Sequence, residues 1–172
     1  DGSFPFAAHT FDGHGFVQHF VDEGPRDGEP IVCLHGEPTW GYLYRHMIEP
    51  LAEDNRVVVP DHMGFGKSET PQDREYTLRT HTENLSALIE HLGLTDITFV
   101  GQDWGGPIAT AYTVRHPERV KRIVFANTLA GYGRVDPASV TPTSESRWFA
   151  WIGGGLESGR TEDVLLNLGS TV

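Results

Sequence analysis

Cysteine is almost absent from this sequence. Cys33 is the single cysteine, and it lies within the apolar run IVCL, so the chain cannot form an internal disulfide or a cysteine cluster for a metal ion. A lone thiol in such a run is expected to be buried and unreactive, which suits a reducing compartment. No other grouping of residues predicts a metal site or a cofactor loop.

Positive charge and long apolar runs are scarce as well. The sequence has 13 Lys and Arg side chains against 24 Asp and Glu, a formal net charge of −11. An excess of this sign repels phosphate backbones and anionic lipid surfaces. No apolar stretch approaches the roughly 20 residues of a membrane span, and the N-terminal residues lack the pattern of a signal peptide. We expect a cytoplasmic protein, unless a signal was already cleaved, with no nucleic-acid or membrane partner.

Short, continuous apolar runs are what the sequence does contain, at residues 31–34, 56–60, 97–101 and 122–127. Runs of this kind fill strands that are buried on both faces. Helical spacing separates them, most clearly over 76–94 and again over 107–120, where a proline ends the helix. This order predicts a doubly wound, mostly parallel α/β sheet. The D-G-H-G turn within residues 9–22 predicts an N-terminal hairpin in front of it.

The alternation of strands and helices stops after Asn127. A stretch rich in Gly, Pro, Ser and Thr follows, and then a segment that favours short helices. We assign residues 1–128 to an α/β core and residues 129–172 to the start of a helical cap. Because the chain does not return to the sheet, one edge would stay uncovered. The chain is therefore expected to be truncated and to be completed by a missing C-terminal segment or a second chain.

The stretch GQDWGG, from Gly101 to Gly106, follows one apolar run and precedes a helix. This is the context of a nucleophile elbow, with Asp103 where Ser would be usual. A carboxylate is already ionised at neutral pH and can attack a saturated carbon, which gives an ester that water can cleave. The sequence therefore favours Asp103 as a nucleophile. The plain alternative is that Asp103 only caps the helix.

A second motif, HGEPTW, starts at His35 directly after the first apolar run. An α/β-hydrolase supplies one oxyanion-hole amide from this position. The backbone N–H groups of Glu37 and Trp104 could then converge on the oxygen that becomes negative when water attacks the ester. We expect His35 itself to be a turn histidine bonded to the backbone.

Three segments in this order, HGEPTWGYLYRHMI, PDHMGFGKSETP and GQDWGG, resemble the haloalkane dehalogenases of the α/β-hydrolase superfamily. The resemblance runs from about residue 11 to about residue 130 and continues more thinly into the cap. It implies hydrolytic dehalogenation of a neutral haloalkane to an alcohol, with Asp103 as nucleophile, water as co-substrate and no cofactor. It also implies that Asp61 has a structural role, shaping the loop after a strand.

The resemblance implies a halide site as well. The indole of Trp104 would donate to the departing halide, since it is a donor without charge; the plain alternative is a core aromatic. Glu37 stands where many dehalogenases have Asn, and this resembles the branch whose second indole comes from the cap. That indole would be Trp151, with Trp148 as the alternative, and ordinary cap packing would give the same spacing. The Glu37 side chain would hold the hydrolytic water, or else be a solvated loop carboxylate.

Two other functions remain open from the sequence. Epoxide hydrolases share the Asp elbow, but they need acidic O–H donors, usually two cap tyrosines, and Tyr132 is the one tyrosine of residues 129–172. A non-catalytic binding protein with the same fold is the other alternative. It gains weight because the family's base His, near the C-terminus, and its acid partner have no counterpart among these residues. We expect the chain alone to alkylate Asp103 once and then stop.

Overall fold

The computed structural model describes residues 2–128. The chain divides into two compact units, residues 1–132 and 133–172, and the description concerns the first of them. The predicted cap, with Trp148 and Trp151, lies outside the described residues, so the proposed domain boundary stays a prediction.

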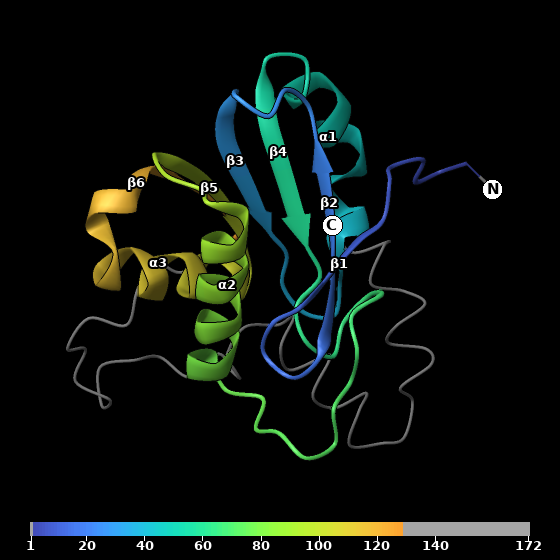
Figure 1. The fold of residues 1–172 in the computed structure, drawn as a ribbon, viewed down its shortest axis with the longest axis vertical. Coiled ribbons are helices and arrows are strands. Elements are labelled where there is room, and N and C mark those ends of the chain that lie inside the picture. The colour runs from blue at the N-terminus through green and yellow to red at the C-terminus, as the bar shows by residue number, and fades with distance from the viewer. Residues whose placement is uncertain (1, 129–172) are drawn as a thin grey trace. The chain divides into compact units, whose positions relative to one another are not determined.

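A six-stranded sheet forms the centre of the described unit (Figure 1). Its strands, in the order β1-β2-β4-β3-β5-β6 across the sheet, are β1 (His9–Asp12), β2 (Val17–Glu23), β4 (Asn55–Pro60), β3 (Glu29–Leu34), β5 (Ile97–Gln102) and β6 (Val120–Ala126). The pairs β4-β3, β3-β5 and β5-β6 are parallel, while β1-β2 and β2-β4 are antiparallel. The mostly parallel α/β sheet and the N-terminal hairpin are therefore confirmed.

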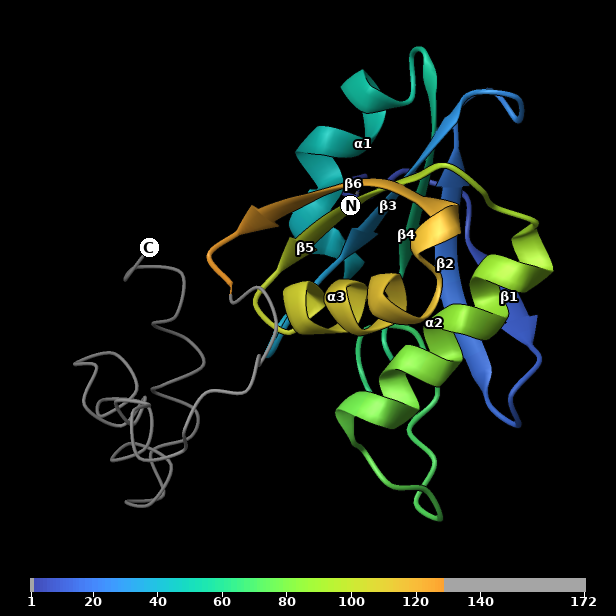
Figure 2. The ribbon, with the colours of Figure 1, turned by 90° about the vertical axis from the view of Figure 1, so that its left-hand side faces the viewer.

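The helices cover both faces of this sheet. Helices α2 (Leu78–Leu92) and α3 (Gly105–Arg115) lie on one face, and α1 (Arg45–Leu51) lies on the other (Figure 2). Two 3₁₀ turns, η1 (Gly41–Tyr44) and η2 (Pro117–Arg119), precede α1 and β6. The sequence pattern did not predict α1, because a helix of 7 residues with a proline in its last turn has no clear apolar period.

Helix α2 shows why the sequence forms these elements. Its first turn is capped by the side chain of Thr77, which accepts a hydrogen bond from the N–H of Thr80 at 3.1 Å. It ends at Gly93, whose φ of 64° is the left-handed conformation that favours glycine. Between these ends, three apolar side chains of α2 are buried in the core: Leu85, Leu88 and Ile89.

Strand β3 contributes to two separate cores because successive side chains point to opposite faces. Val32 and Leu34 pack into the cluster that includes α2 and α3. Ile31 and Cys33 pack into the cluster on the side of α1, with Tyr44 and Ile48. Burial on both faces explains the continuous apolar run that predicted this strand.

The carboxyl ends of β3, β4 and β5 reach the same edge of the sheet. From β3 the chain continues to β4 on one side and then to β5 on the other, so the order of the strands reverses beside β3. Ligands bind at such reversal points in open α/β sheets, outside the carboxyl ends of the strands. None of the helices in residues 2–128 has the length and apolarity that a bilayer crossing requires.

Candidate active site

Asp103 stands at the sharp turn between β5 and α3. Its φ is 50°, which is uncommon for a residue other than glycine and typical of strained functional positions. Gly105 lets α3 approach β3 closely at this turn, because a Cβ at that position would lie 2.0 Å from the carbonyl oxygen of Leu34. The hydroxyl of Thr128 donates to the backbone carbonyl of Asp103 from beyond β6. The local structure is that of a nucleophile elbow.

The Asp103 side chain is directed at the loop after β3. Its Oδ1 accepts a hydrogen bond from the backbone N–H of Glu37 at 2.9 Å. The two loops are in contact, because a Cβ on Gly36 would lie 2.2 Å from both Cβ and Oδ1 of Asp103. The N-cap residue of α3 is Trp104, and no side chain caps that helix. The alternative of a capping Asp103 is therefore wrong.

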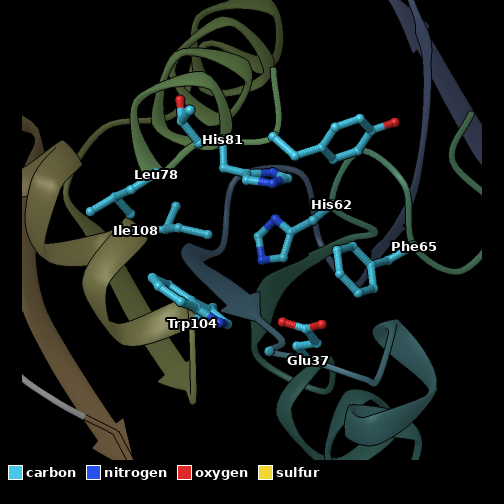
Figure 3. A pocket seen from close by; sticks show the side chains of 10 residues that line it. Glu37, His62, Phe65, Leu78, His81, Trp104 and Ile108 are labelled. Carbon is cyan, nitrogen blue, oxygen red and sulfur yellow. The ribbon is translucent and has the colours of Figure 1, made fainter. Parts of the chain in front are cut away.

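A pocket of about 320 Å³ opens at Glu37 and Trp104, the hydrogen-bond partner and the next residue of Asp103 (Figure 3). Its lining combines apolar and polar side chains with one glycine: Phe65, Tyr76, Leu78, Trp104, Ile108, Glu37, His62, Thr77, His81 and Gly36. The structure thus brings the predicted residues Asp103, Glu37 and Trp104 together. Trp104 is 45% exposed and stands at the pocket, so it is not a core aromatic. The backbone N–H of Trp104, the second predicted oxyanion donor, follows Asp103 directly at the start of α3.

Asp61, which follows β4, organises the adjacent loop from a fully buried position. Its Oδ1 accepts from the N–H of Gly41 at 2.8 Å, and its Oδ2 accepts from the N–H of Lys67 at 2.8 Å. The ring of His19 lies 2.9 Å from the same Oδ2. Burial raises the pKa of Asp61, but the hydrogen bonds from His19 and the two amides outweigh it and lower the pKa overall. The predicted structural role of Asp61 is confirmed.

Three histidine rings, those of His35, His62 and His81, lie in a row from the loops after β3 and β4 to the first turn of α2. The ring centroids of His35 and His62 are 4.3 Å apart, and those of His62 and His81 are 5.7 Å apart. His35 donates from Nδ1 to the carbonyl of Gly36 at 2.8 Å, as expected for a turn histidine. Burial is the main cause that lowers the pKa of all three rings, so they are neutral at pH 7.

Neither His62 nor His81 was singled out in the sequence analysis, although both line the pocket. A signal for His62 was available, since it follows β4 at the carboxyl edge of the sheet, where ligands bind. His81 lies one helical turn after Leu78, which also lines the pocket. The first turn of α2 therefore faces the pocket, while the apolar side chains farther along the helix pack against the sheet.

Comparisons with known proteins agree with this geometry. A profile of the alpha/beta hydrolase fold matches residues 29–170. A haloalkane dehalogenase of Mycolicibacterium paratuberculosis is 47% identical over 131 residues, which are 72% of this chain and 44% of that protein. A cis-3-alkyl-4-alkyloxetan-2-one decarboxylase of Xanthomonas campestris is 44% identical over 124 residues, 67% of this chain and 41% of that protein. The chain spans less than half the length of these two relatives.

Solved structures show the same fold. The haloalkane dehalogenase DpaA of Paraglaciecola agarilytica matches with a TM-score of 0.75 and 35% identity, covering 90% of this chain and 52% of the other. The epoxide hydrolase CorEH matches with a TM-score of 0.74 and 29% identity, covering 86% of this chain and 50% of the other. The elbow, the sheet order and these matches agree: the chain belongs to the α/β-hydrolase fold family, and its resemblance to haloalkane dehalogenases is confirmed.

Proposed function

We propose that the protein catalyses hydrolytic dehalogenation of a neutral haloalkane. Oδ2 of Asp103 attacks the carbon that bears the halogen, the carbon–halogen bond breaks, and the halide departs with the bonding electrons. The observation that carries this proposal is the hydrogen bond from the N–H of Glu37 to Oδ1 of Asp103. It holds the oxygen that becomes the ester carbonyl, and no described residue donates a hydrogen bond to Oδ2.

The halide would be received by Trp104. Its indole stands at the pocket, beside the apolar side chains of Leu78 and Ile108 (Figure 3). An N–H donor in such surroundings stabilises an anion without competing charge. A second indole, from Trp151 of the predicted cap or from Trp148, would complete the halide site.

The second step is hydrolysis of the ester. The Glu37 side chain lines the same pocket and would position the water molecule that attacks the ester carbonyl. The N–H groups of Glu37 and Trp104 would stabilise the oxygen that then becomes negative. A general base is needed for this step, and in the family that this chain resembles it is a His near the C-terminus. Without such a base the ester would form and persist.

A second candidate is decarboxylation of an alkyl-substituted oxetan-2-one. The specific observation is the 44% identity to a decarboxylase of that name, close to the identity to the dehalogenase. Asp103 could attack the saturated ring carbon that bears oxygen, so that the ring opens and a carboxylate leaves. Loss of CO₂ would then form an alkene and expel Asp103 as a free carboxylate. This route regenerates the nucleophile without a water-activating base.

Epoxide hydrolysis and non-catalytic binding have less support. An epoxide hydrolase must protonate the opening oxygen with an acidic O–H group. Tyr76 lines the pocket, but its hydroxyl donates to the carbonyl of Pro71 at 2.9 Å. The other candidate, Tyr132, lies outside the described residues. A binding protein without chemistry would not need the strained φ of Asp103 or its directed carboxylate.

Products separate these functions. The folded chain would be incubated with 1-bromobutane, 1,2-epoxybutane and a cis-3,4-dialkyloxetan-2-one in turn, beside the variant Asp103→Asn. Bromide release that reaches about one equivalent supports dehalogenation with a separate base. Repeated conversion of the oxetanone to an alkene and CO₂ supports the decarboxylase, and a diol from the epoxide supports the hydrolase. No reaction with any of the three, from a demonstrably folded chain, favours binding alone.

A further inference from the structure

The end of the pocket formed by His62 and His81 has no role in the chemistry described above. Both rings line the pocket, on the side away from the loop of Glu37 (Figure 3). His62 is only 5% exposed, so an unused polar atom on this ring is costly unless a ligand or water meets it. A role for these two rings in binding the substrate rests on the proposed dehalogenation.

Hydrogen bonds fix the proton positions of the His62 ring. Its Nε2 lies 3.0 Å from the carbonyl oxygen of His35. A carbonyl oxygen can only accept, so Nε2 carries the proton. In the neutral ring, Nδ1 is then an acceptor with a free lone pair. No residue within 2–128 donates a hydrogen bond to it.

The ring of His35 is held in place by two hydrogen bonds, so it cannot rotate to donate a hydrogen bond to Nδ1 of His62. Its Nε2 accepts from the backbone N–H of His62 at 2.9 Å, while its Nδ1 donates to the carbonyl of Gly36. Both nitrogens of His35 are therefore occupied. The two hydrogen bonds with His35 fix the orientation of the His62 ring. Its Nδ1 is therefore available to a ligand in the pocket.

The ring of His81 lines the pocket next to that of His62. Its ring centroid is 5.7 Å from that of His62, in an edge-on arrangement with an interplanar angle of 68°. Its Nδ1 is buried and has no hydrogen-bond partner among the described residues. Because that nitrogen is closed off from the pocket, the proton that a neutral His81 can offer to a ligand is the one on Nε2.

We propose that His62 and His81 bind a hydroxyl group of the substrate, and that the preferred substrate is a haloalkane with a hydroxyl at the far end of its carbon chain. A hydroxyl donates one hydrogen bond and accepts others, so it can donate to Nδ1 of His62 and accept from His81. An ether, a ketone, a second halogen or a carboxylate has no proton to donate to His62. The apolar walls at Phe65, Leu78 and Ile108 then suit the carbon chain between the two ends.

The test compares substrates that differ only at the far end. The rate constant of the bromide burst would be measured for 6-bromo-1-hexanol and for 1-bromoheptane, which has a methyl group in place of the hydroxyl, and again for longer pairs, with the release by the Asp103→Asn variant subtracted. We expect the hydroxyl compound of the best-fitting pair to react at least roughly tenfold faster. A site built to bind a hydroxyl rejects a compound that lacks it, because the buried polar groups of the site are then left unpaired. A ratio near one for every chain length would overturn the proposal.

Variants locate the effect. His62→Leu should bring the ratio of the two rate constants close to one, and His81→Phe should do the same. The matched control is His46→Leu at an exposed position of α1, which should keep the ratio. If His62→Leu does not fold, His81→Phe alone decides. A variant of either pocket histidine that keeps the ratio would overturn the proposal. Absence of bromide from both compounds would instead refute the dehalogenation on which it rests.

Discussion

The N–H of Glu37 meets Oδ1 of Asp103 at 2.9 Å, although the two residues are 66 positions apart in the chain. Parallel pairing of β3 and β5, with Leu34 opposite Gly101, brings their loops to the same edge of the sheet. The contact holds one carboxylate oxygen in place. It leaves the other oxygen as the attacking atom of the proposed reaction.

Gly36→Ala should disable the nucleophile. The added methyl would lie 2.2 Å from Cβ and Oδ1 of Asp103, so one of the two loops must move. A displacement of about 1 Å can cost roughly a hundredfold in rate. We therefore expect the bromide burst with 1-bromobutane to slow by about that factor, measured by ion chromatography.

A second glycine provides the control. Gly93→Asn introduces a side chain at a helix end where an added Cβ meets nothing within 4 Å, and Asn tolerates the left-handed conformation of that position. Its burst rate should stay within about twofold of the parent. An unchanged burst in Gly36→Ala would mean that the contact between the loops is not needed for reactivity.

Much of this site follows from sequence alone, because its motifs are continuous. The apolar runs predict β3, β4 and β5, and the elbow and the HGEPTW loop follow two of them directly. The row of three histidines depends instead on how the first turn of α2 lies over the loop after β4. A helical period shows that Leu78 and His81 share one side of α2, but not that this side turns to a pocket rather than to the sheet.

Asp61→Asn should destabilise the fold rather than change specificity. The carboxylate is fully buried and accepts from two backbone amides and His19. An amide would turn an N–H group toward at least one of these donors, and a buried donor left without its acceptor costs about 1–3 kcal/mol. Urea unfolding followed by circular dichroism measures the loss.

The control for Asp61 is Asp54→Asn at an exposed position. A surface substitution of this type should change the free energy of unfolding by no more than about 0.5 kcal/mol. Equal effects of the two substitutions would contradict the structural role of Asp61.

Stability should fall as the pH drops below 6.5. The pKa values of His35 and His62 are lowered from 6.5 in the folded protein, mainly by burial, so both rings stay neutral there. Below pH 6.5 these histidines take up protons in the unfolded chain. Each buried ring then lowers the free energy of unfolding by at most about 1.4 kcal/mol per pH unit. The pKa values of Asp22 and Asp61 are lowered from 3.8 in the folded protein. Protonation of these carboxylates therefore reduces the stability further only at a pH below about 3.8.

Urea midpoints measured between about pH 7.5 and about pH 5.5 separate the histidines from the carboxylates. The midpoint should be constant above the ordinary histidine pKa and fall below it. A midpoint that does not change over this range would contradict the burial of neutral histidines.

Cys33 should be unreactive in the folded chain. Its side chain is fully buried, and burial raises its pKa to about 12. Since the thiolate is the reactive form, a disulfide reagent added at neutral pH should label it only as fast as the chain unfolds. Rapid labelling without denaturant, followed by absorbance, would show that the interior near β3 is open.

The most direct test of the account is to locate the alkyl group after reaction with 1-bromobutane. Intact-mass measurement and peptide mapping of the 172-residue chain should find one butyl group, on the peptide that contains Asp103, in an amount equal to the bromide released. The Asp103→Asn variant should carry none. An unmodified chain that is demonstrably folded and releases no bromide, or a butyl group on another residue such as His62, would contradict Asp103 as the nucleophile.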